Sequence, residues 1–316
     1  MTTKPLLTPS LYTFLSDLID YAGLYPPAQL PLYDAITNYV QYRRADDAWM
    51  LAHFVIGANR LAELSAILTE HPYMLDAEPL SFAVVGRGGT TVEDFMESLK
   101  ADAAAIQTFI FTHAPKVNVA QFEVKLPVLA DAAAVTQLCH ASHAILNRPI
   151  FFEPALNDDW HENITQAVTG VAAFGQGAGI KLRTGGLVAD AFPTTEQISH
   201  ALIACRDARV PLKFTAGLHH PIRQFREEVQ EKMYGFVNLF GAGLLAQADH
   251  FSPAQINLVL NDEHADHFRF DERGFHWQVY EVKTEQIAAA RQSALISFGS
   301  CSFDEPREDL QALGWL

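Results

Sequence analysis

Apolar segments of strand length recur at a nearly constant interval along this chain of 316 residues. Their centres fall near residues 19, 51, 82, 123, 151, 181 and 213. Each step is therefore roughly 30 residues, the length of one strand–helix–strand unit. An eighth apolar segment, residues 296–299, precedes a final helix start. Alternating strands and helices favour a mostly parallel sheet. Eight such strands predict an α/β fold in which the sheet closes into a (β/α)8 TIM barrel.

The connection between the seventh and eighth strands is too long for one helix. We expect a helix over residues 227–246, a further helix that begins after Ser252, and a small hairpin over residues 268–277. We therefore expect a single TIM-barrel domain over residues 1–316, with inserted helices and a small hairpin around 250–285. An open doubly wound sheet is the competing fold, but no Gly-x-Gly-x-x-Gly motif follows the first strand.

Charge and cysteine content exclude several classes of protein. The chain has 37 acidic and 22 basic residues, a formal net charge of −15. This surplus disfavours binding to nucleic acid or to anionic membranes. No apolar run reaches the ~18 residues that a membrane-spanning helix needs. The first residues lack a signal-peptide pattern, so we expect a cytoplasmic protein. Cys139, Cys205 and Cys301 form no CxxC pair and predict neither a disulfide framework nor a zinc cage.

Charged side chains occupy one parity of four successive predicted strands, and apolar side chains occupy the other. Side chains alternate between the two faces of a strand, and one face of a barrel strand points into the lumen. A barrel that needs only stability fills its lumen with Val, Ile and Leu. The register therefore predicts a functional lumen, which contains Glu123, Lys125, Glu153, Lys181, Arg183, Lys213 and Thr215.

The predicted lumen carries more cations than anions. Four basic side chains face Glu123 and Glu153, or three carboxylates if Asp20 from the first strand joins them. Burying a charge costs several kcal/mol unless it is paired. A small anionic molecule that bears a phosphate or carboxylate would balance this charge. The alternative is a closed network of ion pairs that only holds the lumen together.

Lys181 and Lys213 lie at equivalent depths on adjacent predicted strands. A nearby cation and desolvation lower the pKa of a lysine and expose its amine as a nucleophile. Such a pair is typical of lyases that form an imine with a carbonyl substrate, with Glu153 or Glu123 carrying protons. Either lysine taken singly is equally consistent with phosphate binding or with an ion pair.

The two lysine segments resemble those of a known family. Lys-Leu-Arg-Thr-Gly at 181–185 is similar to the Lys-x-x-Thr-Gly segment of the deoxyribose-phosphate aldolase family of class I aldolases. Lys-Phe-Thr-Ala-Gly at 213–217 is similar to that family's Lys-Ala-Ser-Gly-Gly strand. The resemblance implies that Lys181 forms the Schiff base and that Lys213 adjusts the pKa of Lys181.

The sequence also departs from this family. Arg183 stands where the family has serine, and no aspartate occupies the place of the family's catalytic one, for which Glu123 is the nearest polar candidate. Over nearly its full length the chain, with its segments 20–28 and 299–306, resembles a group of uncharacterised bacterial proteins, which implies no activity.

Further residues near the predicted strand ends are candidates for substrate binding. They are His219, His220, Arg87, Gly185, Gly186, Ser300 and Ser302. Glycine lets backbone N–H groups approach an anion, and the N-terminus of the last helix is a common phosphate site in barrels. Glu123, Glu153 and His219 could instead hold a divalent metal, but adjacent histidines on an extended segment point apart.

The sequence thus predicts a class I aldolase-type lyase that needs no cofactor or metal. Its proposed catalytic groups are Lys181, Lys213, Glu153 and Glu123, with Lys125 and Arg183 as the anion clamp and Thr215 beside them. Two alternatives stay open: a metal-dependent isomerase or hydrolase, and a non-catalytic anion-binding barrel. Residues 268–277 and 315–316 are apolar enough to meet a second copy of the chain or to cover a barrel end, so a homo-oligomer is also open.

Overall fold

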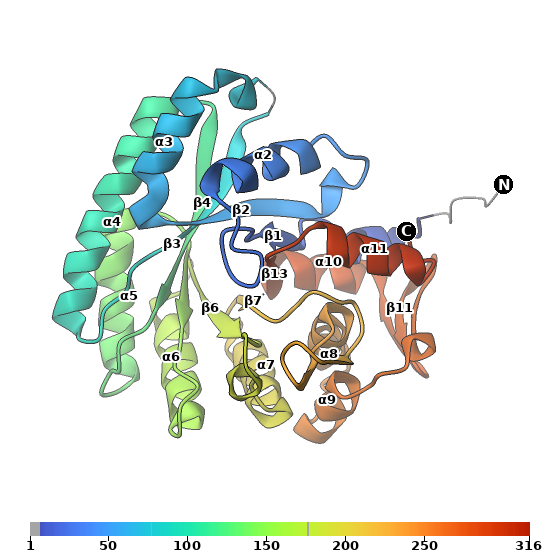
Figure 1. Cartoon of the computed structure of the whole chain (residues 1–316). Helices are drawn as coiled ribbons and strands as arrows, with labels where there is room; N and C mark the ends of the chain where they lie inside the picture. Colours follow the sequence, from blue (N-terminus) through green and yellow to red (C-terminus); the bar gives the residue numbers. More distant parts are fainter. Residues whose placement is uncertain (1–6, 77, 176) are drawn as a thin grey trace.

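The computed structural model describes residues 7–76, 78–175 and 177–316. Its centre is a closed barrel of eight strands in the order β1-β13-β7-β6-β5-β4-β3-β2, and every neighbouring pair is parallel. The predicted TIM-barrel fold is confirmed (Figure 1). The barrel strands are β1 Ile19–Tyr21, β2 Leu51–Gly57, β3 Leu80–Val85, β4 Val117–Lys125, β5 Ile150–Glu153, β6 Ala178–Arg183, β7 Leu212–Thr215 and β13 Leu295–Ser300.

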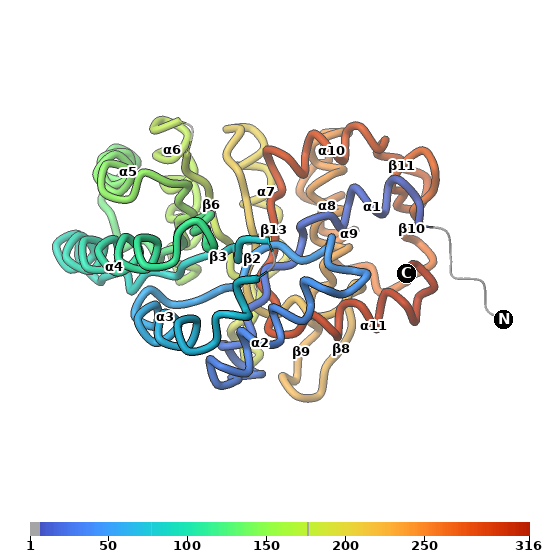
Figure 2. Tube along the Cα trace, turned by 90° about the horizontal axis from the view of Figure 1, so that it is seen from above, coloured from blue at the N-terminus to red at the C-terminus, as the bar shows by residue number. Residues whose placement is uncertain are grey.

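Helices surround the strands on the outside of the barrel (Figures 1 and 2). Their starts follow local chemistry: Thr194 and Gln197 form a capping box before α7, and Ser252 and Gln255 form one before α9. The helices are α1 Pro9–Leu15, α2 Leu32–Tyr42, α3 Leu61–Glu70, α4 Val92–His113, α5 Ala132–Leu146, α6 Trp160–Phe174, α7 Thr195–Ala208, α8 Phe236–Asp249, α9 Pro253–Leu260, α10 Thr284–Ser293 and α11 Asp304–Ala312. No helix of the described residues is long and apolar enough to span a membrane.

The long connection between β7 and β13 differs in part from the prediction. The expected helix over 227–246 begins only at Phe236, because residues before it form the hairpin β8 Gln224–Arg226 and β9 Glu231–Met233. Gln230, with φ 54°, takes the left-handed conformation that lets the chain reverse there. The hairpin expected over residues 268–277 is present, and a third strand extends it. The three strands are β10 Phe268–Phe270, β11 Gly274–Trp277 and β12 Tyr280–Lys283.

Strand register aligns the charged residues of the lumen. Lys181 of β6 pairs with Lys213 of β7, and Lys125 of β4 pairs with Glu153 of β5. The predicted equal depth of the two lysines is confirmed by this pairing. Phe151 is the partner of Glu123 and lies in the same layer, where its ring centroid is 5.5 Å from Lys213 Nζ.

The absence of a side chain at Gly179 makes room for this aromatic ring. A Cβ at Gly179 would lie 2.6 Å from Phe151 Cε1 and 2.7 Å from the Pro211 carbonyl oxygen. The backbone oxygen cannot move aside as a flexible side chain would. The lumen is thus packed without spare volume around Gly179.

We predict that Gly179→Ala destabilises the protein by about 1–3 kcal/mol, the usual cost of overpacking. Gly299→Ala is the matched control on β13, since its Cβ would meet only Thr215 Oγ1, at 3.3 Å. Urea unfolding midpoints of the two variants check this. Equal losses in both would contradict the packing argument.

Candidate active site

A cavity of about 420 Å³ opens at the carboxyl ends of the barrel strands. Each of the eight strands, or the loop directly after it, contributes to its wall. This is the end of a TIM barrel at which active sites are found. Ten of the residues predicted from the sequence line it together: Arg87, Glu123, Lys125, Glu153, Lys181, Arg183, Gly186, Lys213, Thr215 and His219.

Two buried lysines and three carboxylates form one continuous network at the floor of this cavity. Glu123 accepts bonds from both lysines: its Oε2 lies 3.2 Å from Lys181 Nζ, and its Oε1 bonds to Lys213 Nζ. Glu153 Oε2 is 2.9 Å from Lys181 Nζ, and Asp20 Oδ2 is 2.8 Å from Lys213 Nζ. The five side chains come from five different strands, so the network ties the barrel across its lumen.

The carboxylates determine the protonation state of the two lysines. Burial works to lower the pKa of both lysines, but Glu123 and Glu153 raise the pKa of Lys181, and Asp20 and Glu123 raise that of Lys213. Burial works to raise the pKa of Glu123, yet the two ammonium groups outweigh it and hold that pKa at about 2. Lys181, Lys213 and Glu123 are therefore charged near neutral pH.

Two expectations from the sequence need correction here. The expected lowering of a lysine pKa by its cationic neighbour is wrong, because Glu123 stands between the two ammonium groups and screens one from the other. The expected surplus of cations holds for the predicted lumen residues as a whole, four basic against three acidic, but not at the floor, where two ammonium groups face three carboxylates and the formal charge is −1.

The positive charge lies instead at the rim. Lys125 and Arg183 are exposed and line the cavity, and no carboxylate of the described residues lies within ion-pair distance of either. Arg87 also lines the cavity; its Nε lies 2.7 Å from Oδ1 of Asp102, a buried residue of α4 that fixes its position. The rim can thus attract an anion, and the buried network of lysines and carboxylates lies at the floor.

Five of the predicted binding residues do not line the cavity. Asp20 lies beneath it, since it bonds to Lys213, to Ser297 Oγ (2.6 Å) and to the backbone N–H of His53. The other four are turned to structural contacts. His220 bonds Asp309, Ser302 accepts from the N–H of Glu305, Gly185 packs against Gly217, and Ser300 points to the opposite face of β13 from Gly299 and Cys301.

His219 does reach the cavity, with partners that the sequence did not indicate. Its Nδ1 lies 3.0 Å from Glu305 Oε2 and 3.8 Å from Cys301 Sγ, and Cys301 also lines the cavity. Burial works to lower the pKa of His219, but its bonds to Cys301 and Glu305 raise it to about 9. The metal set expected from the sequence, Glu123, Glu153 and His219, does not converge, because both glutamates bond to lysines instead.

Three further lumen residues escaped the sequence argument. Gln121 Nε2 donates to Glu123 Oε1 (3.2 Å), Ser297 Oγ donates to Asp20, and the ring of Phe151 lies over Lys213. Gln121 shares the parity of Glu123, and Phe151 shares that of Glu153, so the alternation rule could have found these two. Ser297 has the opposite parity to Ser300, the candidate residue predicted on the same strand. All three are uncharged, whereas the sequence pattern that marks the lumen is one of charged residues.

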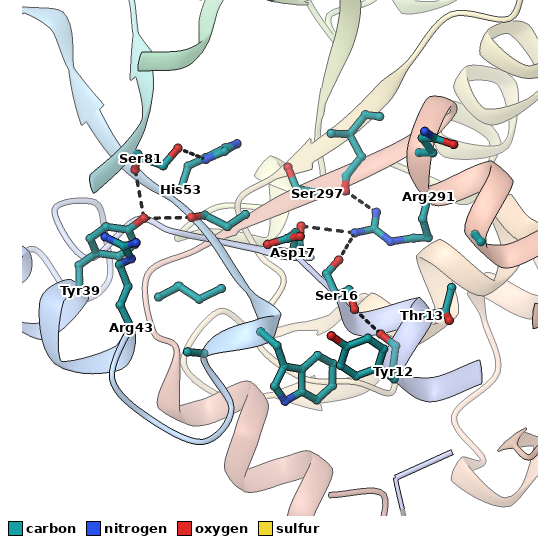
Figure 3. Close-up of a pocket in the computed structure, with 17 residues that line it drawn as sticks. Tyr12, Thr13, Ser16, Asp17, Tyr39, Arg43, His53, Ser81, Arg291 and Ser297 are labelled. Carbon is teal, nitrogen blue, oxygen red and sulfur yellow. Dashed lines mark hydrogen bonds between the residues drawn. The ribbon is translucent and has the colours of Figure 1, made fainter. Parts of the chain in front are cut away.

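A second and larger cavity, of about 910 Å³, lies at the amino ends of the strands (Figure 3). Two of its large polar side chains are bonded to backbone oxygens: Tyr39 donates to the carbonyls of Ala52 and Ser81, and Arg291 donates to those of Phe14 and Ser16. This end of a TIM barrel serves stability. The carboxyl-end cavity is therefore the candidate active site.

Comparison with known proteins adds little beyond the fold. No family model matches the sequence, and no curated protein is similar to it. Among solved structures, the chain is similar to the tetrameric deoxyribose phosphate aldolase from Aeropyrum pernix, with 12% sequence identity and a TM-score of 0.43. The match covers 69% of this chain and 82% of that one.

We predict that Lys213→Met destabilises the protein by about 3–5 kcal/mol, because it leaves Asp20 and Glu123 buried with one cation fewer. Lys125→Met is the matched control: this exposed lysine has no ion pair in the described part of the chain, so its loss should stay within about 0.5 kcal/mol. Urea unfolding measures both, and a small effect at Lys213 would refute its part in the network.

Acid stability should also depend on Glu123. Its pKa falls from 4.5 to about 2 on folding, so it contributes stability that is present above pH 4.5 and lost as the pH falls toward 2. We expect Glu123→Gln to flatten the fall of unfolding free energy over that range, and the exposed Glu308→Gln to leave it as in the parent protein. Unfolding curves at several pH values test this; parallel curves for all three proteins would exclude the depressed pKa.

Proposed function

We propose that this protein is a class I aldolase-type lyase that forms an imine between Lys181 and a small anionic carbonyl compound. The observation that carries the proposal is the Glu123 carboxylate that bonds both buried lysines at the floor of the active-site end of the barrel. The resemblance of residues 181–185 and 213–217 to the lysine strands of class I aldolases supports the same assignment.

The raised pKa of Lys181 is compatible with imine formation. The lysine ammonium and the carbonyl compound together yield an iminium ion and water, so the positive charge at Nζ is the same before and after the reaction. The carboxylates that stabilise the ammonium therefore stabilise the iminium too. Glu153, 2.9 Å from Nζ, accepts the proton that the amine must release before it attacks the carbonyl carbon, and returns it to the departing oxygen.

Lys181 is a better nucleophile candidate than Lys213. Lys213 is 1% exposed, and Asp20, Glu123 and the Phe151 ring surround its ammonium group. Lys181 is 5% exposed, and its partner Glu153 lies nearer the cavity mouth, at 7%. In this arrangement Lys213 keeps Glu123 ionised and in place, which is a positioning role.

The same groups supply the proton transfers and the electron sink that cleavage of a carbon–carbon bond requires. A base removes the proton of a hydroxyl group on the carbon β to the iminium carbon, and a carbonyl product leaves. The electrons of the broken bond enter the iminium, which becomes a neutral enamine. The protonated base then returns its proton to the enamine carbon, and water releases the second carbonyl product from Lys181. Glu153 is the base within reach.

The spacing of the charges suggests the size of the substrate. Arg183 follows Lys181 by two positions on β6, so their Cα atoms are roughly 6.6 Å apart along the strand. A chain of a few carbon atoms spans this distance between a carbonyl at Lys181 and a phosphate or carboxylate at the rim. Arg183, Lys125 and Arg87 supply the cations there.

We predict that sodium borohydride traps a covalent adduct on Lys181 when the protein is incubated with dihydroxyacetone phosphate, pyruvate or acetaldehyde. Hydride reduces the iminium to a stable secondary amine, which peptide mass analysis locates. Lys181→Arg should abolish the adduct, and Lys100→Arg, on the outer helix α4, should leave it unchanged. Arg183→Gln should weaken trapping of the anionic probes more than that of acetaldehyde.

Absence of any adduct across the panel would overturn imine chemistry. Tight retention of anions without an adduct would then indicate a barrel that binds a ligand and catalyses nothing. An adduct located on Lys213 would keep the reaction class but reverse the roles of the two lysines.

A further inference from the structure

We propose that His219, Cys301 and Glu305 form a binding site for one zinc-type divalent cation. The site lies at the rim of the carboxyl-end cavity, which Lys181 and Lys213 also line. The ligand atoms of His219, Cys301 and Glu305 lie within 4.8 Å of one another, and within the described part of the chain this is the one group of three such side chains that meets this criterion. His219 and Cys301 are buried and Glu305 is partly buried. This site is separate from the imine chemistry proposed above and does not depend on it.

Two of the three distances between the donor atoms are close to the edges of a tetrahedron around zinc. Bonds of about 2.3 Å to sulfur, 2.1 Å to nitrogen and 2.0 Å to oxygen imply sulfur–nitrogen and nitrogen–oxygen edges of roughly 3.6 and 3.4 Å. The observed separations are 3.8 Å from Cys301 Sγ to His219 Nδ1 and 3.0 Å from that nitrogen to Glu305 Oε2. Only small side-chain shifts separate this arrangement from a bound ion.

Convergence on one nitrogen distinguishes this arrangement from a catalytic cysteine–histidine pair. In such a pair the thiol faces one ring nitrogen, and the carboxylate orients the ring through the other nitrogen. Here Nδ1 is the ring nitrogen that bonds Glu305, and it is also the one nearer to Cys301 Sγ, since Nε2 lies 4.0 Å from the sulfur. The thiol therefore does not face the ring nitrogen opposite the carboxylate, and the three side chains offer a cation one donor atom each within 4.8 Å of one another.

The scaffold holds the ligands on neighbouring elements. His219 follows β7, Cys301 follows β13, and these two strands pair directly. Glu305 lies in the first turn of α11, where the hydroxyl of Ser302 accepts a bond from its backbone N–H. A thiolate, an imidazole and a carboxylate together suit zinc better than magnesium or calcium.

A fourth coordination position would open into the cavity, because Cys301 and His219 line it alongside Lys181 and Lys213. Three protein ligands with one open position are typical of a zinc ion that acts on a substrate rather than one that only supports the fold. The ligand for that position is an oxygen donor, either water or a hydroxyl or carboxylate oxygen of the molecule in the cavity.

Cobalt(II) titration of the full-length, chelator-stripped protein tests this site without any activity assay. We expect one Co²⁺ per chain and a near-ultraviolet charge-transfer band, which only a thiolate ligand produces, and Zn²⁺ should displace the Co²⁺. Cys301→Ala should abolish the band, and His219→Asn should weaken Co²⁺ affinity at least about 100-fold, since even outer-sphere changes cost 10–100-fold.

Matched controls exclude general damage to the fold. His220→Asn alters the neighbouring histidine, which bonds Asp309 outside the cavity, and Cys139→Ala removes a thiol buried at α5; both should bind Co²⁺ like the parent protein. Circular dichroism establishes that each variant is folded. Lack of Co²⁺ binding by the parent protein, binding without the thiolate band, or equal binding by the Cys301 and Cys139 variants would overturn the proposal.

Discussion

One carboxylate, that of Glu123, bonds to both buried lysines, and the organisation of the lumen depends on it. An ammonium group withdrawn from water costs several kcal/mol unless anions surround it. Here each lysine has two carboxylate partners, and Glu123 is common to both. The partners come from β1, β4 and β5, and the lysines from β6 and β7. A one-residue slip in the register of any of these strands would turn a charge toward the apolar helices, so the network that we propose for the chemistry also favours the observed register.

The sign of the charge differs between the floor and the rim of the cavity. The floor is anionic by one unit, and the rim carries Lys125 and Arg183 without carboxylate partners among the described residues. In the proposed function, this arrangement would place the anionic group of a small molecule at the rim and its uncharged end toward Lys181. The chain as a whole has a net charge of −15, so this local field is the feature that favours an anionic ligand.

Periodic features of the sequence were enough to predict the barrel, the positions of all eight strands and the lumen-facing parity of β4, β5, β6 and β7. Their physical basis is short-range, since strand length and alternation are local properties. The protonation of the lysines could not be predicted in this way. Asp20 and Glu123 are far from Lys213 in the sequence, and only the closed sheet shows that carboxylates lie between the two cations. The hairpin at 224–233 was missed for a related reason, since its polar residues resemble an exposed helix face until the reversal at Gln230 is seen.

Cys301 illustrates the same limit at the rim. Its spacing from the other cysteines excludes a zinc cage, and that inference is sound for ligands that are close in sequence. A site assembled from loops that follow neighbouring strands has no such spacing: His219 and Cys301 are brought together because β7 pairs with β13. Since β6, β7 and β13 are consecutive in the barrel, Lys181, Lys213 and Cys301 occupy one arc of the cavity wall. The two proposed devices can therefore act on one small molecule, with the lysine engaging its carbonyl carbon and the cation engaging another of its oxygens. They share no side chain, so the loss of either would leave the other intact.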